Sequence, residues 1–253
     1  MNNPETNTGL KISFCTKSDV GKIREQNEDF MGDFKCESAR VFVVCDGLGG
    51  HAGGEIASKL AVNTIKEFIT ENPKKITDIS VLICEALNIA NNTILKEAKE
   101  NTDLKGMGTT CVILILIKGL AYFGNVGDSR LYLIREGKIK QISIDQSYVQ
   151  ELVDKGIISP EQAKYQPGRN IVLQALGNDN TFGPQLNPGG MEIFKNDKFI
   201  LCSDGLSGML SDNEILDTAE KYGFPGACEK LVEFANAMGG IDNITVQVVQ
   251  IDD

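Results

Sequence analysis

The sequence predicts an α+β protein in which antiparallel sheets are covered by helices. Most of the β-like runs follow one another without a helix between them, and Glu136-Gly137 joins two of them as a two-residue hairpin. Two long helical segments follow one another in the first half of the chain instead of alternating with strands. This order disfavours a doubly wound parallel sheet, in which each strand would be followed by its own helix.

Each expected element rests on the spacing of its apolar residues. Strands are expected where apolar residues alternate or run together over short stretches between turn residues. They cover residues 11–16, 40–45, 110–117, 120–125, 131–135, 138–142, 191–194, 198–202 and 245–251. Helices are expected where apolar residues recur at helical spacing, as Ile56, Leu60, Ile65 and Ile69 do. They cover residues 54–70, 76–100, 148–155, 160–164, 212–222 and 225–238.

The chain is long enough for one large domain with a substantial core, because 42% of its 253 residues are hydrophobic. Residues 1–9 are polar and are expected to form a flexible N-terminal tail, which leaves residues 10–253 as the single domain. Residues 143–188 differ from the rest because Gly, Pro and Asn interrupt short helical stretches. We expect this segment to run over the surface of the domain.

The charge balance argues against binding to nucleic acid, and the short apolar runs argue against a membrane protein. Lys and Arg number 25 and Asp and Glu 35, which gives a formal net charge of −10, whereas a nucleic-acid-binding protein needs a basic face. The longest uninterrupted apolar run, residues 111–117, is far shorter than the roughly 20 residues of a membrane span. No cationic segment followed by an apolar one opens the sequence, so we expect no secretory signal and a cytoplasmic protein.

Several catalytic mechanisms lack the residues that they need. A single histidine, His51, excludes zinc sites built from two or three imidazoles, and neither a G-x-S-x-G nor a G-x-x-x-x-G-K-[ST] segment is present. The seven cysteines include no C-x-x-C pair, and none is followed six positions later by an arginine, which argues against a cysteine-based phosphatase. Their odd number and their places inside apolar runs predict reduced, structural thiols.

Four aspartates stand at the ends of expected strands. Asp46, Asp128 and Asp204 each follow an apolar strand and precede Gly or Ser, and Asp242 lies just before the last strand. Any one of them alone is typical of turn chemistry. Antiparallel neighbours can bring such positions together, and four gathered carboxylates repel one another unless a divalent cation neutralises them. Since no histidine or cysteine ligand is near, the oxygen ligands favour Mg²⁺ or Mn²⁺.

The loop after Asp46 permits a second interpretation. Residues 47–52 fit the pattern G-x-G-x-x-A between a strand and a helix, as in dinucleotide-binding folds. Two features disfavour it. Asp46 would place a carboxylate beside the pyrophosphate, and the first helix is followed by another helix instead of the strand whose acidic end should hold the ribose.

A charged segment upstream of these strands mixes one arginine with acidic residues. Such a segment is typical of a solvated loop, but Arg24 could also bind a phosphate oxygen with its rigid fork of donors. In that case Glu28 and Asp29 would lie behind the metal ligands and orient them.

Six segments occur in the order in which they are found in one known family. They are S-D-x-G-x-x-R-x-x-N-E-D from Ser18, V-C-D-G-L-G-G-H-x-x-G-E-x-A-S from Val44, G-M-G-T-T from Gly106, G-D-S-R from Gly127, L-C-S-D-G-L from Leu201 and G-x-x-D-N-x-T from Gly239. Together they span nearly the whole chain, which resembles the bacterial branch of the metal-dependent serine/threonine protein phosphatases, the protein phosphatase 2C class or PPM family. The resemblance implies a four-layer α-β-β-α sandwich with two central antiparallel sheets flanked by helices.

The resemblance also implies the roles of the aspartates. Asp46 would bridge two ions of Mn²⁺ or Mg²⁺, the carbonyl of Gly47 would bind one of them, and Asp204 and Asp242 would complete the other. Asp128 matches the residue that holds a third, weaker ion in bacterial members. A water bridging the first two ions would attack phosphorus in line, without a covalent enzyme intermediate.

The proton for the leaving serine oxygen has two candidate sources. Eukaryotic relatives carry a histidine directly after the Asp-Gly pair, where this sequence has Leu48. His51 lies three residues further on, at the expected start of a helix, and is one candidate general acid. A metal-bound water is the other. Arg24 would stabilise the phosphoryl oxygens in either case.

By the same resemblance, the substrates are proteins that carry phosphoserine or phosphothreonine, including a serine/threonine kinase, and the enzyme opposes bacterial serine/threonine kinases. We expect it to be a monomer. Residues 143–188 correspond to the variable flap beside the family's active site and are expected to help select the phosphoprotein. Two alternatives remain, a protein that binds phosphoproteins without turnover and a phosphatase for small phosphate esters. The complete set of expected metal ligands favours catalysis over the first, whereas the second would differ only in the flap.

Overall fold

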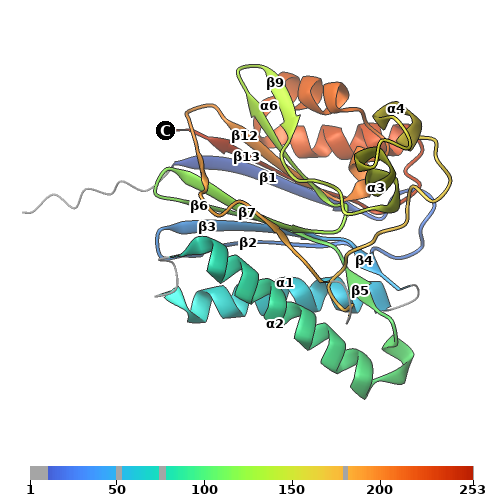
Figure 1. Ribbon diagram of the computed structural model, residues 1–253. Helices are drawn as coiled ribbons and strands as arrows, with labels where there is room; N and C mark the ends of the chain where they lie inside the picture. The colour runs from blue at the N-terminus through green and yellow to red at the C-terminus, as the bar shows by residue number, and fades with distance from the viewer. Residues whose placement is uncertain (1–10, 50–52, 74–77, 179–181, 253) are drawn as a thin grey trace, which may run out of the picture.

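Two antiparallel β-sheets lie face to face, and helices cover the outer face of each (Figure 1). This computed structural model describes residues 11–49, 53–73, 78–178 and 182–252. The layers confirm the α+β class and the α-β-β-α sandwich expected from the sequence.

The strands form two large sheets and one short pair within the described residues. The first sheet has the order β1 (Ile12–Asp19), β13 (Ile244–Ile251), β12 (Lys198–Cys202), β8 (Arg130–Arg135) and β9 (Lys138–Gln141). The second has the order β10 (Gln185–Leu186), β7 (Leu120–Val126), β6 (Cys111–Ile117), β3 (Ala39–Cys45) and β2 (Phe30–Cys36), and β11 (Met191–Glu192) also pairs with β7. The short pair consists of β4 (Gly47–Leu48) and β5 (Gly108–Thr109).

The helices are divided between the two outer faces and one end of the sandwich. Helices α1 (Gly53–Glu71) and α2 (Ile79–Glu100) cover the second sheet, and α6 (Asp212–Ala237) covers the first (Figure 1). A 3₁₀ turn at Thr102–Leu104 follows α2. The short helices α3 (Tyr148–Asp154) and α4 (Pro160–Ala163) lie at the end of the sandwich near β4, and α5 (Asp204–Ser207) follows β12 directly.

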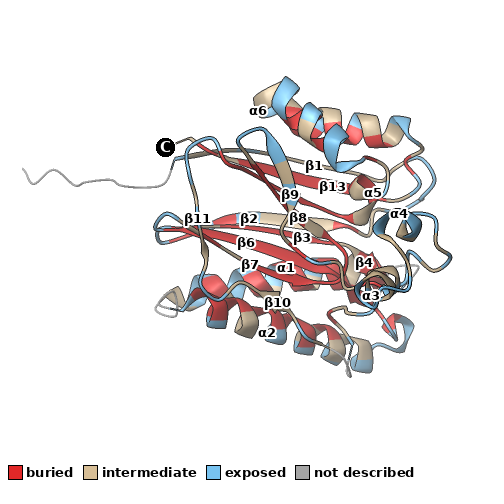
Figure 2. Cartoon of the chain, turned by 45° about the horizontal axis from the view of Figure 1, so that its top comes forward, coloured by how far each residue is buried: buried red, intermediate tan, exposed pale blue. Residues whose placement is uncertain are grey.

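Strand β6 is apolar throughout, and β3 is apolar apart from Arg40, because both of their faces are buried. Along β3, Val41 and Val43 pack in the core shared with α1 and α2, whereas Phe42 and Val44 pack in the core between the two sheets. Strand β6 alternates in the same way. Figure 2 shows these strands almost entirely buried, while α1 and α2 expose their outer sides. Continuous apolar runs therefore mark the inner layers of the sandwich.

Besides shifts of a few residues at element ends and the short elements β4, β5, β10 and α5, which were not expected, two elements differ from the sequence expectation. Strand β2 was not expected, because Gly32 and Asp33 interrupt its apolar pattern, and pairing with β3 along its whole length holds it in place. Helix α2 begins at Ile79, where the Asp78 side chain accepts a hydrogen bond from the Val81 amide, instead of at residue 76. The two helices expected over 212–222 and 225–238 are confirmed within α6, because residues 223–224 between them have non-helical backbone.

The expectation that every cysteine is reduced is wrong. Cys15 of β1 and Cys228 of α6 form a disulfide, with their Cα atoms 6.0 Å apart. Both side chains pack in the core between the first sheet and α6. The 213 residues that separate them in sequence leave no spacing signal, so only the packing of helix on sheet could show the pair.

The predicted hairpin at Glu136-Gly137 is present between β8 and β9. Both residues have positive φ, 53° and 70°, as this two-residue turn requires. Among the described helices, none is both long enough and apolar enough to cross a membrane.

Candidate metal and phosphate site

The four aspartates that end or precede strands line one pocket at the edge of the sandwich, with a volume of about 200 Å³. Asp46 follows β3, Asp128 lies in the turn after β7, Asp204 follows β12, and Asp242 lies two residues before the start of β13. The expected site residues that line the pocket are Arg24, Glu28, Asp46, Gly47, Asp128, Asp204 and Asp242. The antiparallel pairing thus brings together positions that are up to 196 residues apart, from Asp46 to Asp242.

The carboxylates destabilise one another's charged forms. Burial, reinforced by the charges of neighbouring carboxylates, raises the pKa of Asp46 well above its ordinary value. The same causes raise the pKa of Asp128 to about 7, with Asp204 as its main charged neighbour. Burial and the charge of Asp242 likewise raise the pKa of Asp204. Carboxylates gathered in this way favour a bound proton or a cation among them.

The pocket fits a divalent cation. The buried oxygens Asp204 Oδ1 and Asp29 Oδ1 have no hydrogen-bond partner among the described residues, although buried polar atoms are normally paired. The donors are oxygen atoms, which Mg²⁺ and Mn²⁺ prefer. Within the described chain, no three carboxylate, thiol or imidazole side chains are gathered closely enough to hold an ion by themselves. An ion here therefore needs further oxygen ligands, such as a backbone carbonyl or water.

Two glycines allow the loops of the pocket to approach closely. A Cβ at Gly47 would lie 2.2 Å from the carbonyl oxygen of Gly54, and a Cβ at Gly205 would lie 1.9 Å from the carbonyl oxygen of Asn243. Both distances are far below any real carbon–oxygen contact. These positions require glycine because backbone from another segment fills the space of a side chain.

Two threonines, Thr109 and Thr110, fix the backbone of Asp46. The Thr109 hydroxyl donates to the Asp46 carbonyl at 2.8 Å, and the Asp46 amide donates to the Thr110 hydroxyl at 3.0 Å. The Thr110 and Ser129 hydroxyls share a hydrogen bond of 2.7 Å, which links the loops of Asp46 and Asp128. The G-M-G-T-T segment had no role predicted from the sequence. In the structure its two threonines support the backbone of Asp46.

Asn243 was not predicted as a site residue, although it lines the pocket. Its Oδ1 accepts a hydrogen bond from the Glu28 amide at 2.8 Å, and its Nδ2 donates to the carbonyls of Val20 and Gln26. It therefore holds the segment that carries Arg24 against the start of β13. The only sequence signal was its place directly after Asp242.

Arg24 lies at the rim of the pocket, and its side chain is half exposed. Its Nη2 donates to Asp242 Oδ2 at 2.8 Å. The guanidinium is thus held beside the expected metal ligands, where an incoming phosphate would pass. Whether it binds that phosphate stays a prediction.

Glu28 and Asp29, expected behind the ligands, lie in different surroundings. Glu28 lines the pocket, and its carbonyl accepts hydrogen bonds from the Gly47 amide and the Ser58 hydroxyl. Asp29 is buried, and its Oδ2 accepts a hydrogen bond of 2.7 Å from the hydroxyl of Ser203, the residue before Asp204. Burial raises the pKa of Asp29 to about 7. The candidate general acid, His51, lies outside the described residues.

The flap supplies part of the pocket wall. Asn170 and Val172, both inside the expected excursion of residues 143–188, line the pocket together with the aspartates. Leu48 and Gly49 line it from the loop after Asp46. The flap was expected near the site, but neither Asn170 nor Val172 was predicted from the sequence.

An α-β-β-α sandwich with an acidic pocket at the edge of its two sheets defines the class of protein. Residues 23–239 match the family model described as Protein phosphatase 2C, and the chain belongs to this family. The resemblance noted in the sequence is thereby confirmed.

Relatives of known name agree with this assignment. The serine/threonine protein phosphatase PstP of Mycobacterium tuberculosis is 34% identical over 244 residues, which are 96% of this chain and 46% of PstP, so the chain spans about half the length of that relative. The serine/threonine phosphatase Stp of Listeria welshimeri is 35% identical over 238 residues, covering 92% of this chain and 94% of Stp. The crystal structure of the PstP catalytic domain in complex with two manganese ions matches with a TM-score of 0.85 and 34% identity, over 96% of this chain and 99% of that domain.

Proposed function

We propose that this protein is a metal-dependent phosphatase that removes phosphate from phosphoserine and phosphothreonine in proteins. The observation that carries the proposal is the convergence of four aspartates, from four different strand ends, on one pocket in a chain of the Protein phosphatase 2C family. The two manganese ions in the PstP complex support a site for two ions.

The proposed metal ligands are the oxygen donors that line the pocket. Asp46 and the carbonyl of Gly47 belong to one loop, and Asp204 and Asp242 face Asp46 from the other sheet. Asp128 is the ligand proposed for a third ion. Bound Mn²⁺ or Mg²⁺ lowers the pKa of water into the neutral range and stabilises negative charge on phosphoryl oxygens. The buried, unpartnered Oδ1 of Asp204 supports this assignment.

Residues of the chain itself bind and orient the phosphate. Arg24 offers a rigid fork of N–H donors at the rim of the pocket, which suits phosphate oxygens. Its ion pair with Asp242 holds the guanidinium in place before substrate arrives. The leaving serine or threonine oxygen receives its proton from His51 or from water, since residue 48 is a leucine.

The substrates proposed for the protein are phosphoproteins, including targets of the bacterial serine/threonine kinases that it would oppose, and it would act as a monomer. The names of its relatives as serine/threonine protein phosphatases support the protein substrate. The pocket wall contributed by the flap is a surface that a protein substrate can contact and a small ester does not need.

Hydrolysis of a phosphothreonine peptide tests the proposal. The wild-type protein is stripped of metal with a chelator and assayed, then assayed again after Mn²⁺ is restored in excess. Asp204→Asn is assayed under the same conditions. Asp197→Asn serves as a matched control, because Asp197 is also buried but pairs with Arg135, away from the four aspartates.

We expect turnover that disappears on chelation, returns with Mn²⁺ and is lost in Asp204→Asn but retained in folded Asp197→Asn. A wild-type protein that is folded and loaded with Mn²⁺ but hydrolyses no phosphopeptide contradicts the proposal. Such a result would leave a protein that binds phosphoproteins without turnover.

A further inference from the structure

The flap is joined to the loop of Asp128 through one residue near its start, Gln146. The Gln146 amide donates to the carbonyl of Gly127 at 2.9 Å, and the Gly127 amide donates to Oε1 of Gln146 at 2.9 Å. Gly127 directly precedes Asp128. Both the backbone and the side chain of Gln146 therefore hold the turn that presents this carboxylate.

The same glutamine holds the returning half of the flap. The Leu173 amide donates to the Gln146 carbonyl at 2.8 Å, and Nε2 of Gln146 donates to the carbonyl of Gly183 at 2.8 Å. Leu173 follows Val172, which lines the catalytic pocket with Asn170. Gln146 thus connects the Asp128 turn to the wall of the pocket.

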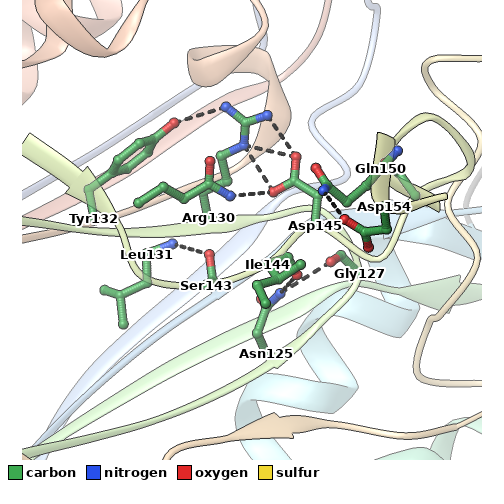
Figure 3. A network of polar contacts seen from close by, with 12 residues as sticks. Asn125, Gly127, Arg130, Leu131, Tyr132, Ser143, Ile144, Asp145, Gln150 and Asp154 are labelled. Carbon is green, nitrogen blue, oxygen red and sulfur yellow. Dashed lines mark hydrogen bonds and ion pairs between the residues drawn. The ribbon is translucent and has the colours of Figure 1, made fainter. Parts of the chain in front are cut away.

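A partly buried ion pair fixes the junction from the other side (Figure 3). Arg130, two residues after Asp128, donates from Nε to both oxygens of Asp145 at 3.0 Å and from Nη2 to Oδ2 at 2.7 Å. Its Nη1 donates to the Tyr132 hydroxyl at 3.0 Å. Asp145 is the neighbour of Gln146, and the bidentate contact gives this junction a fixed geometry.

The far end of the same wall is bound to the loop of Asp46. Thr109 and Leu176 exchange backbone hydrogen bonds of 3.0 and 2.8 Å, and the Thr109 hydroxyl donates to the carbonyl of Asp46. The segment from Asn170 to Leu176 is therefore held between the Asp46 loop and Gln146. Its position is tied to the carboxylates themselves.

We propose that Gln146 is a positioning residue for protein substrates. It holds the wall formed by Asn170 and Val172 in register with the Asp128 turn, so a phosphoprotein that contacts the wall binds with its phosphate aligned over the aspartates. A small phosphate ester has no extended chain to lie along the wall, so it depends on the Gln146 side chain less than a phosphoprotein does. This inference rests on the proposed phosphatase function.

The test compares Gln146→Met with Gln150→Met in the Mn²⁺-loaded protein. Methionine keeps the length of the side chain and removes its hydrogen bonds, and Gln146 is not fully buried, so the fold tolerates the change. Gln150 is the matched control, because its Nε2 donates only within α3, to Asp154 at 2.8 Å (Figure 3). The KM and kcat are measured for a phosphothreonine peptide and for p-nitrophenyl phosphate.

Gln146→Met is expected to raise the KM for the peptide about tenfold, the effect of losing two ordinary hydrogen bonds, with kcat changed less. Its KM for p-nitrophenyl phosphate should rise much less than its KM for the peptide, because the backbone amide of Gln146 still donates to the Gly127 carbonyl and keeps the Asp128 turn in place. Gln150→Met should match the wild type with both substrates. Limited trypsin digestion gives a second readout, in which cleavage at exposed Lys164 and Arg169 of the flap is faster in Gln146→Met than in Gln150→Met.

Equal KM values and equal cleavage rates for Gln146→Met and the wild type would overturn the proposal, and so would an equal loss with both substrates. The digestion also separates this inference from the proposed function. A wild type that hydrolyses no ester would refute the function, while the cleavage rates would still decide whether Gln146 holds the flap.

Discussion

Replacing Asp128 by asparagine should stabilise the metal-free protein, although such a substitution also removes a proposed metal ligand. Asp128 is only 8% exposed, and burial together with Asp204 raises its pKa from 3.8 to about 7. One pKa unit corresponds to about 1.4 kcal/mol, so the ionised carboxylate is about 4 kcal/mol less stable in the folded metal-free protein than in the unfolded chain. A neutral side chain of the same shape avoids this penalty.

The gain is smaller than the full penalty because the buried amide also needs hydrogen-bond partners. We expect the free energy of unfolding to rise by about 2 kcal/mol at pH 7.5, which corresponds to roughly 4–8 °C in the thermal midpoint of a chain of this size. The folded-state pKa lies above the unfolded one, so the wild type loses this stability as the pH rises from about 4 to about 7. The advantage of Asp128→Asn should therefore shrink when the pH is lowered to about 5.

Thermal melts followed by circular dichroism in the presence of a chelator measure both effects. Asp197→Asn is the control and should lower the thermal midpoint. Asp197 is buried in an ion pair with Arg135, so its replacement leaves the guanidinium without its carboxylate partner. A lower midpoint for metal-free Asp128→Asn than for the wild type at pH 7.5 would refute the reasoning.

Three further outcomes are expected. Mn²⁺ should raise the thermal midpoint of the wild type, and by more at pH 8 than at pH 6. Protons compete with the ion for Asp46 and Asp128, because the pKa values of both are raised. An equal shift of the midpoint at both pH values would contradict this. Arg24→Lys should raise the KM for a phosphopeptide about tenfold with little change in kcat, since a point charge replaces a bidentate fork; an unchanged KM would remove Arg24 from phosphate binding. Gly205→Ala should destabilise the fold by roughly 3 kcal/mol or more in denaturant titrations, because its Cβ would meet a carbonyl oxygen at 1.9 Å, whereas Gly189→Ala, which has open space, should not.

Most of the fold could be predicted from the sequence because the inner strands are buried on both faces. The apolar run of β6 and the hairpin at Glu136-Gly137 were recognisable from residue type alone. Strand β2 was not, since its pairing with β3 decides its conformation and its own residues do not. The disulfide between Cys15 and Cys228 was missed for a related reason, because it depends on how α6 packs against β1.

The aspartates of the site were predictable because each stands at the end of an apolar strand. The residues that hold them in place were harder to predict. The side chains of Asn243 and Thr109 donate to backbone carbonyls of segments far away in the sequence, and no local sequence pattern predicts such hydrogen bonds. Asn170 and Val172 reach the pocket only because the flap folds back over it. Sequence patterns thus predicted the residues proposed as ligands, and the structure shows which residues support them.

A crystal structure of the protein soaked with Mn²⁺, with an anomalous difference map, tests the central claim most directly. The account predicts two strong peaks in the pocket, both in contact with Asp46, one bound by the carbonyl of Gly47 and the other by Asp204 and Asp242. A fully occupied crystal that shows no peak among these residues, or shows Mn²⁺ only elsewhere on the molecule, would contradict it.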